Sequence, residues 1–417
     1  MRRAALGLAA ALTTTSPLSA QAPVTGYVSM LLDVVGRPAT GGADRDADVE
    51  WRPRAFLEYR RDVGDHVRLR LSGCVEGLVA DRHQAESPTS DLIARPQELY
   101  VEFVSERADL RLGYSRIVWG RLDELQPTDV VNPLDLAKFF FEGRAEARIP
   151  VAMARARVFL PASTTLEAVV VPQFRPGRFD QLDEPSSAFN LLAGILPPGT
   201  ERGPGPHTSW ANLQGGARLQ TTSGRVDWSV SGYRGFETFG VLQLAPDAAA
   251  VEEVFPRFTM VGGDFETVHG EWGIRGEVAA FVDDSFQATD VPVALDGRSV
   301  EGGIGADRKA GNFRVSGNML LRRRFVDERQ SSDFDASDVN LIASIDRSFS
   351  RETRTLQVFG VYDPTEATSF LRGIFTVRLT DRLSVEVSGG LFSGSGTDTL
   401  GRFTDRDFVY LKVKRQF

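Results

Sequence analysis

The chain has 417 residues, a formal net charge of -8 and charged side chains at 25% of its positions. After the first twenty residues, no run approaches the roughly 18–20 consecutive apolar residues that a membrane-spanning helix needs. Spanning helices are therefore excluded, whereas a transmembrane β-barrel is not, because only every second residue of its strands faces lipid. The single cysteine, Cys74, excludes an intramolecular disulfide. The acidic balance argues against a nucleic-acid partner.

The N-terminus has the pattern of a secretory signal. Two arginines precede an apolar run at residues 4–12, and small residues suited to cleavage follow by residue 22. We expect residues 1–22 to be a signal peptide that is removed on export, and residues 23–417 to form a single domain. A short buried helix is the alternative interpretation of the apolar run.

The dominant period in the rest of the chain is two. In the clearest case, apolar or small residues at odd positions from Val67 to Val79 alternate with polar residues from His66 to Glu76. Such a run exceeds the usual strand of five or six residues in a soluble protein. It matches the roughly 9–11 residues that a tilted strand needs to cross a bilayer. The same alternation recurs at residues 212–220, 226–231, 271–280, 313–322 and 383–391.

Short turns and longer polar connections alternate along the chain. Eight short turns are predicted near residues 64, 106, 161, 223, 269, 310, 350 and 380. Nine longer connections separate them, at residues 36–49, 80–94, 116–150, 173–208, 236–256, 283–298, 325–337, 363–367 and 393–405. This predicts an all-β fold, a transmembrane antiparallel up-and-down β-barrel of 18 strands, with 16 as the alternative. An even number of strands places both termini on the periplasmic side.

The third long connection, residues 116–150, does not alternate, and we name it the inner loop. Asn132 followed by Pro133 resembles a helix N-cap with proline at the first helical position, and Asp135 suits the positive end of a helix. We expect a short helix over residues 133–141. The apolar side chains of the loop disfavour free exposure to water. The loop is therefore predicted to fold into the barrel and narrow the lumen.

A channel needs fixed charge at its constriction, because such charge decides which solutes enter. The residues of the inner loop predicted to form this constriction are Arg116, Trp119, Arg121, Asp123, Glu124, Asp129, Asn132, Asp135 and Glu142. Facing them, the lumen phase of the early strands carries a predicted basic strip of Arg52, Arg54, Arg60, Arg68, Arg70 and Arg111. The two sets either create a transverse field across the pore or form ion pairs that tie the loop to the wall, and the two interpretations are compatible.

The same region resembles a known family. The stretch from Gly113 to Phe174 is similar to a family of uncharacterised porin-like outer-membrane β-barrels, related in style to the alginate-export type. The resemblance implies a barrel, export and transport of lipidic or other poorly soluble compounds, without a known substrate. The residues that carry it are Gly113, Arg116, Trp119, Gly120, Asn132, Pro133, Asp135, Pro150 and Val151.

The chain ends in an alternating strand whose last residue is Phe417. This resembles the C-terminal signal by which the barrel-assembly machinery recognises and inserts outer-membrane barrels. Arg415 departs from the pattern, since an apolar residue is usual there, but an interfacial arginine can snorkel to the headgroups. We expect the partners to be outer-membrane lipids and the assembly machinery, and we leave open whether the protein forms a homo-oligomer.

Signals for catalysis are weak. The four histidines, His66, His83, His207 and His269, do not stand at metal-ligand spacing, and no G-x-S-x-G motif occurs. No catalytic residue, metal or cofactor is predicted. The predicted function is an outer-membrane porin-like channel for passive or weakly selective passage of small or poorly soluble solutes. The alternatives are an outer-membrane hydrolase acting on lipids, with His66 as the candidate base, and a plugged structural or adhesive barrel.

Overall fold

The computed structural model describes residues 24–36, 47–81, 89–179, 189, 205–244, 251–288, 292–326, 336–395, 398 and 400–417. The predicted signal peptide, residues 1–22, lies outside the described residues. Within the described part, eighteen strands form one antiparallel sheet. They are β1 (Val24–Gly36), β2 (Ala47–Val63), β3 (Val67–Asp81), β4 (Thr89–Val104), β5 (Ala108–Ser115), β6 (Val151–Leu160), β7 (Thr164–Val171), β8 (Gln214–Ser223), β9 (Val226–Phe236), β12 (Arg257–His269), β13 (Trp272–Gln287), β14 (Ala294–Ala310), β15 (Phe313–Val326), β16 (Ser337–Phe349), β17 (Arg354–Asp363), β18 (Thr368–Thr380), β19 (Leu383–Ser393) and β20 (Phe408–Gln416).

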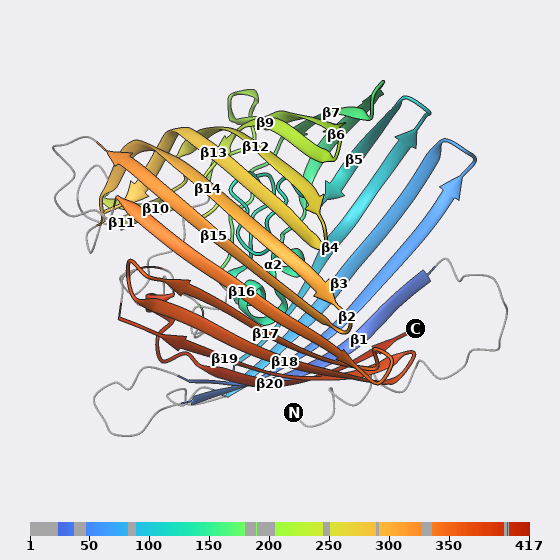
Figure 1. The fold of residues 1–417 in the computed structure, drawn as a ribbon, viewed down its shortest axis with the longest axis vertical. Helices are drawn as coiled ribbons and strands as arrows, with labels where there is room; N and C mark the ends of the chain where they lie inside the picture. Colours follow the sequence, from blue (N-terminus) through green and yellow to red (C-terminus); the bar gives the residue numbers. More distant parts are fainter. Residues whose placement is uncertain are drawn as a thin grey trace.

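The sheet closes into a ring. Each strand pairs with the next strand of the ring, and β1 pairs with both β2 and β20 (Figure 1). Beyond the last rung, Gly26 and Phe417 exchange backbone hydrogen bonds of 3.2 and 3.1 Å. The predicted number of 18 strands is confirmed, and 16 is wrong. Closure leaves no sheet edge with unpaired backbone groups, as a structure inside hydrocarbon requires.

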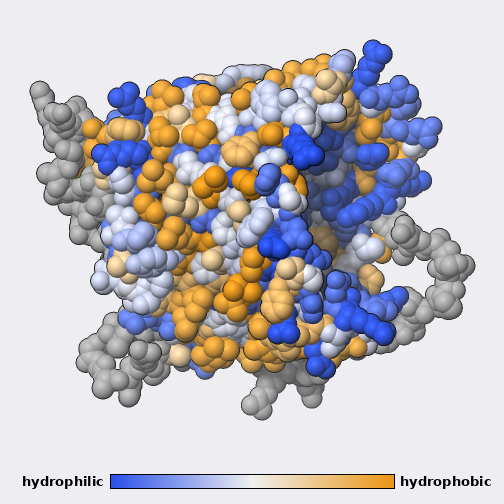
Figure 2. All heavy atoms as spheres, in the orientation of Figure 1, coloured by the Kyte–Doolittle hydropathy of each residue, from blue (hydrophilic) through white to orange (hydrophobic). Residues whose placement is uncertain are grey.

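The period of two places apolar side chains outside and polar ones inside. On β1, Met30 and Leu32 face outwards and are 50% and 48% exposed, whereas the adjacent side chains of Leu31 and Asp33 are buried. Hydrophobic spheres cover much of the wall in Figure 2, and hydrophilic ones gather around the hollow beside it. Such an outer face suits lipid, which replaces the packed core of a soluble protein.

The two ends of the barrel differ in their connections. All eight predicted short turns join strands at one end of the barrel, which we name the short-turn end. β1 begins and β20 ends at this same end. Four of these turns place glycine at φ near +60°, a conformation that residues with a Cβ adopt only at a cost: Gly64, Gly224, Gly270 and Gly311. The longer connections lie at the opposite end, where β10 (Val241–Leu244) and β11 (Val251–Val254) pair as a separate hairpin.

The third of these longer connections turns back into the ring, as predicted, and carries the helices α1 (Leu136–Glu142) and α2 (Arg144–Ala147) (Figure 1). The predicted helix start at Pro133, capped by Asn132, is wrong. Asp135 is the N-cap, and its side chain accepts a hydrogen bond of 3.0 Å from the Lys138 N–H. Two single 3-10 turns follow later, η2 (Trp210–Asn212) and η4 (Gly401–Phe403). None of the described helices has the length and apolar character that would let it span a bilayer.

Candidate functional site

The inner loop crosses the lumen and contacts the wall at three places. The first anchor is Trp119, whose indole N–H donates to Glu167 of β7 at 2.7 Å. The ring is buried and lies edge-on to Tyr233 of β9, with ring centroids 6.1 Å apart. Ile117 and Val131 of the loop belong to the same buried cluster. The predicted burial of the apolar part of the loop therefore occurs against the inner face of β6 to β13.

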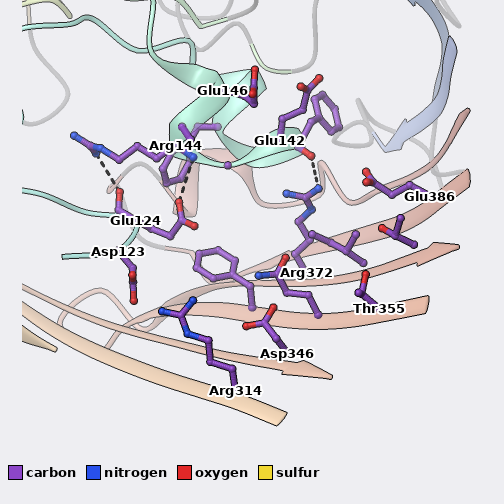
Figure 3. A pocket seen from close by; sticks show the side chains of 18 of the residues that line it. Asp123, Glu124, Glu142, Arg144, Glu146, Arg314, Asp346, Thr355, Arg372 and Glu386 are labelled. Carbon is purple, nitrogen blue, oxygen red and sulfur yellow. Dashed lines mark hydrogen bonds between the residues drawn. The ribbon is translucent and has the colours of Figure 1, made fainter. Parts of the chain in front are cut away.

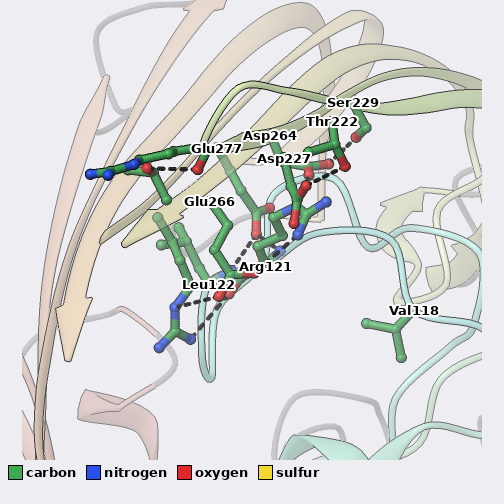
Figure 4. Close-up of polar contacts among 12 residues, drawn as sticks. Val118, Arg121, Leu122, Thr222, Asp227, Ser229, Asp264, Glu266 and Glu277 are labelled. Atoms are coloured by element: carbon green, nitrogen blue, oxygen red, sulfur yellow. Dashed lines mark hydrogen bonds and ion pairs between the residues drawn. The ribbon is translucent and has the colours of Figure 1, made fainter. Parts of the chain in front are cut away.

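The second anchor fixes residues 120–123 to the wall formed by β12 and β13 (Figure 4). The Arg121 guanidinium donates to Asp264 at 2.6 Å and to Glu266 at 3.0 Å. Glu277 accepts hydrogen bonds from the backbone N–H groups of Arg121 and Leu122 and from the Thr128 hydroxyl. This anchor holds the backbone of the loop, through two N–H groups, as well as the Arg121 side chain. Its hydrogen bonds are charge-assisted and therefore stronger than neutral ones.

Asp123 and Glu124 of the predicted constriction follow directly. Asp123 pairs with Arg275 of β13 at 2.8 Å and accepts a hydrogen bond from Asn318 of β15. Glu124 accepts from the Arg144 N–H at 3.3 Å inside the loop. Burial raises the pKa of Glu124, although Arg144 opposes that rise. Asp123 thus ties the loop to β13, whereas Glu124 is bound within the loop.

The third anchor is α1, which packs on β18 to β20 at the opposite side of the ring. Phe140 and Phe141 enter a buried aromatic cluster, and the Tyr410 hydroxyl donates to the Phe141 carbonyl at 3.0 Å. Arg372 donates to the same carbonyl (Figure 3). The aromatic residues of the wall and the connections in this cluster include Phe370, Phe392, Phe403 and Phe408. Aromatic packing of this kind contributes more than the buried area alone.

Glu142, at the end of α1, joins the loop to the early strands. Arg54 of β2 pairs with it at 2.8 Å. Burial opposes ionisation of Glu142, but Arg54, Lys412 and Lys138 outweigh that effect and lower its pKa well below the usual range. These three cations therefore favour the charged form of the carboxylate.

Asn132 and Asp129 brace the loop internally. Asn132 accepts from the Ile117 N–H at 2.9 Å and donates to the carbonyls of Ser115 and Ile149 at 3.1 and 2.9 Å. It thereby joins the two ends of the loop where they leave β5 and enter β6. Asp129 accepts from Trp119, Arg144 and Arg148. Arg116 lines the cavity described below.

The predicted basic strip is interleaved with glutamates of the same strands. Arg70 pairs with Glu58 and Glu98, each at 2.6 Å. Arg54 reaches the inner loop through Glu142. Neighbouring carboxylates therefore compensate much of the charge of the strip. The remaining wall pairs are Arg52–Glu50, Arg60–Glu58, Arg68–Glu102 and Arg111–Glu102.

A cavity of about 1760 Å³ lies beside the inner loop, and its lining reaches turn residues of the short-turn end. Figure 3 shows part of this lining. Its lining includes loop residues such as Arg116 and Arg148, wall residues such as Asp346 and Arg372, and turn residues such as Asn312. The volume exceeds the roughly 300–1,000 Å³ of a typical small-molecule site. The loop thus narrows the lumen without filling this half of it.

The histidine singled out by the sequence lies away from this cavity. His66 occupies the exposed turn between β2 and β3, where its Nδ1 is 3.1 Å from the Val104 carbonyl. In the part of the chain that the structure describes, no three or more metal-ligating side chains come together.

The wall partners of the inner loop were not identified from the sequence. Glu167, Asp264, Arg275, Glu277 and Arg372 all lie on the lumen side of their strands. The alternation marks Arg275 and Glu277 as lumen residues. It does not show which of many such residues the loop passes, because that depends on the path of the loop through the ring.

A closed 18-stranded barrel with an apolar outer face, a polar lumen and an inward third loop is the architecture of porin-like outer-membrane proteins. The chain belongs to the family described as "Protein of unknown function (DUF1302)", whose model matches residues 80–343, more than half of the chain. The predicted resemblance to a family of uncharacterised barrels is confirmed at this level. No curated protein matches the sequence.

Solved structures show the same fold. OccAB1 of Acinetobacter baumannii has a TM-score of 0.55 at 11% identity, over 94% of this chain and 96% of that one. A BenF-like porin of Pseudomonas fluorescens has a TM-score of 0.55 at 10% identity, over 95% and 98% of the two chains. OccK2 (OpdF) of Pseudomonas aeruginosa has a TM-score of 0.52 at 12% identity, over 94% and 97%. At these identities the likeness is one of fold.

Proposed function

We propose that the protein is an outer-membrane channel through which small solutes diffuse beside the inner loop. The observation that carries the proposal is the cavity of about 1760 Å³, which the loop borders and whose lining includes residues of two turns at the short-turn end. Charged side chains from the wall and the loop line it, as expected of a water-filled path. The described chain begins at Val24 and ends at Phe417, both at the short-turn end, which we assign to the periplasmic side.

The anchors support a fixed constriction and not a hinged gate. Trp119, Arg121 and Glu142 contact the wall at separate points around the ring. Of the two interpretations of the charged residues, these ion pairs favour the one in which they tie the loop to the wall. A transverse field is compatible with this arrangement, because Arg116 and the less buried arginines of the wall also face the cavity.

We propose transport and not catalysis, with export by the N-terminal signal and insertion through the C-terminal strand. Phe417 is 43% exposed on the outer face, where the insertion machinery can reach it. The relation to alginate-export barrels stays a prediction, and so does a homo-oligomer. A hydrolase would need a base beside a hydroxyl nucleophile, whereas the contact of His66 is with a backbone carbonyl.

Planar-bilayer recording of the refolded full barrel tests the proposal. Folding is checked first by the shift in electrophoretic mobility between heated and unheated protein. Stepwise conductance from the folded barrel is the expected result. Folded barrel that inserts into vesicles but passes no current overturns the channel and supports a plugged structural or adhesive barrel. Release of fatty acid from the vesicle lipid would instead support the hydrolase.

A further inference from the structure

The cavity beside the inner loop has a basic lining in an acidic chain. Among its described lining residues, fourteen are arginine or lysine and nine are aspartate or glutamate, although the chain as a whole carries a net charge of -8. Walls of one sign in a confined space raise the local concentration of the opposite ion. The inference below rests on the proposed channel and concerns what the channel binds.

Part of this basic lining lies where α1 meets β1, β2 and β20, in company with Glu142, Glu146 and Glu386. Lys138 projects from α1, and Lys412 and Lys414 occupy neighbouring lumen-facing positions of β20, so all three lysines line the cavity. Arg54 lies beside them and forms ion pairs of 2.6 and 2.8 Å with Glu76 and Glu142. We name Lys138, Lys412 and Lys414 the lysine cluster.

The contacts of the lysine cluster with carboxylates are long. Lys412 is 3.8 Å from Glu142 and Lys138 is 3.9 Å from Glu76, beyond hydrogen-bond length. Both carboxylates already accept the short ion pairs of Arg54. In the described structure, Lys414 has no carboxylate within ion-pair distance, and its ammonium instead lies 4.1 Å from the centre of the Tyr27 ring. Glu76 and Glu142 thus each face Arg54 and one lysine of the cluster, while Glu386, opposite Lys412 on β19, accepts a hydrogen bond from Tyr410. The three lysines line the cavity.

A flat apolar surface borders the cluster. Tyr27 of β1 and Phe56 of β2 are stacked, with ring centroids 5.2 Å apart and an interplanar angle of 21°. Both rings line the cavity together with Phe139 of α1. Flat rings of this kind bind a planar or apolar group, while ammonium groups bind its charged end.

We propose that the lysine cluster, with Tyr27 and Phe56, forms a binding site for small organic anions that pass through the channel. The ammonium groups hold the acidic group of the solute and replace the loose contacts with Glu76 and Glu142. The apolar body of the solute lies on the stacked rings. Such a site slows the passing anion without trapping it, because lysine is a flexible point charge and not a bidentate clamp.

The test is bilayer recording with potassium benzoate as probe and benzamide as its uncharged analogue. The wild-type channel should favour anions over potassium in its reversal potential, and benzoate should reduce the single-channel current in a saturable manner. Benzamide should have little effect. The variant K412M/K414M should bind benzoate about tenfold more weakly, since two weakly screened charges are removed, and K412R/K414R should retain most of the binding.

A charge-matched variant separates the cluster from the general charge of the cavity. Lys309 and Arg351 also line the cavity, near the short turns, and K309M/R351M removes the same formal charge. We expect this variant to bind benzoate as the wild type does. Equal weakening in both double variants, or equal block by benzamide, overturns the proposed site while leaving the channel intact. Absence of conductance in the wild type is a different result, which contradicts the proposed function itself.

Discussion

Glu277 of β13 accepts a hydrogen bond of 2.5 Å from the backbone N–H of Leu122, in the first part of the inner loop. It also accepts one from the N–H of Arg121. Successive N–H groups that point to one carboxylate form an anion-binding concavity. Here the anion belongs to the barrel wall, so the loop is held by its backbone at the point where it reaches the far side of the lumen.

Replacing Glu277 by glutamine should loosen the loop and leave the barrel intact. An amide keeps one acceptor oxygen but loses the charge, and hydrogen bonds to charged groups contribute roughly 1.5–3 kcal/mol each. We expect more frequent brief closures in single-channel recordings, with unchanged strand content by circular dichroism. Glu266→Gln is the matched control, because Glu266 is 42% exposed and contacts only the side chain of Arg121 in the loop. Identical gating in wild type and Glu277→Gln would count against this anchor.

Gly120→Ala should disturb the same contact from the other side. Gly120 has a φ of +95°, and a Cβ there would lie 2.8 Å from the Glu277 carboxylate. Alanine therefore meets both backbone strain and a clash with the group that holds the loop. We expect Gly120→Ala to show the same increase in brief closures as Glu277→Gln. Because the two residues act in one contact, the double variant should close little more often than either single variant. Additive effects contradict this.

Gly64→Ala is the control for backbone strain alone. Gly64 also has a positive φ, of +62°, but a Cβ there meets nothing within 4 Å. Its substitution should lower stability slightly and leave single-channel behaviour as in the wild type.

The barrel could be predicted from the sequence because the patterns that define it, alternation within strands and the spacing of turns, are formed by residues close together in the chain. An alternation such as that from Val67 to Val79 fixes which side chains face lipid, and the spacing of turns fixes how many strands there are. Neighbouring strands are also neighbours in sequence, so no long-range pairing had to be inferred. The exception is the ring closure of β1 on β20, which an even number of strands in a membrane requires.

The site could be predicted only in part. The inner loop was identified because it breaks the alternation, but its contacts join residues far apart in sequence, such as Trp119 to Glu167 and Arg121 to Asp264. The helix start was misplaced because Asn132 has two possible uses. Its side chain can cap a helix or form hydrogen bonds that bridge two backbone segments. Here β5 and β6 lie side by side, and Asn132 bridges the loop residues that follow β5 and precede β6.

Asn132→Ala should destabilise the junction of the inner loop with the wall. The change leaves the Ile117 N–H and the carbonyls of Ser115 and Ile149 without this partner, and each buried polar group left unpaired costs roughly 1–3 kcal/mol. We expect a lower midpoint of guanidinium unfolding for the refolded barrel. Asn132→Asp keeps the acceptor oxygen but loses the N–H donors. Its unfolding midpoint should therefore lie between those of the wild type and of Asn132→Ala. An aspartate variant as stable as the wild type shows that the donated hydrogen bonds are unimportant.

The contact of the β10–β11 hairpin with the barrel should weaken as pH rises. Glu237 lies between β9 and this hairpin, and burial, reinforced by Asp284 and Glu301 and opposed by Arg322, raises its pKa to about 8. A carboxyl whose pKa is raised on folding binds its proton more tightly in the folded state. It therefore favours that state at low pH, and stability falls as pH rises from about 4.5 towards 8.

Hydrogen exchange of the hairpin amides tests this at pH 6 and pH 9, after correction for the intrinsic rates. Leu242 should show the change most directly, since its N–H is donated to Gln287 of β13 at 2.6 Å, where it records contact between hairpin and wall. We expect lower protection at pH 9 in the wild type and no pH dependence in Glu237→Gln, which is neutral throughout. Glu252→Gln is the control, because Glu252 binds Gln243 within the hairpin. Its pH dependence should match the wild type. Loss of the dependence in both variants would assign the effect to the charge of the whole hairpin and not to the buried carboxyl.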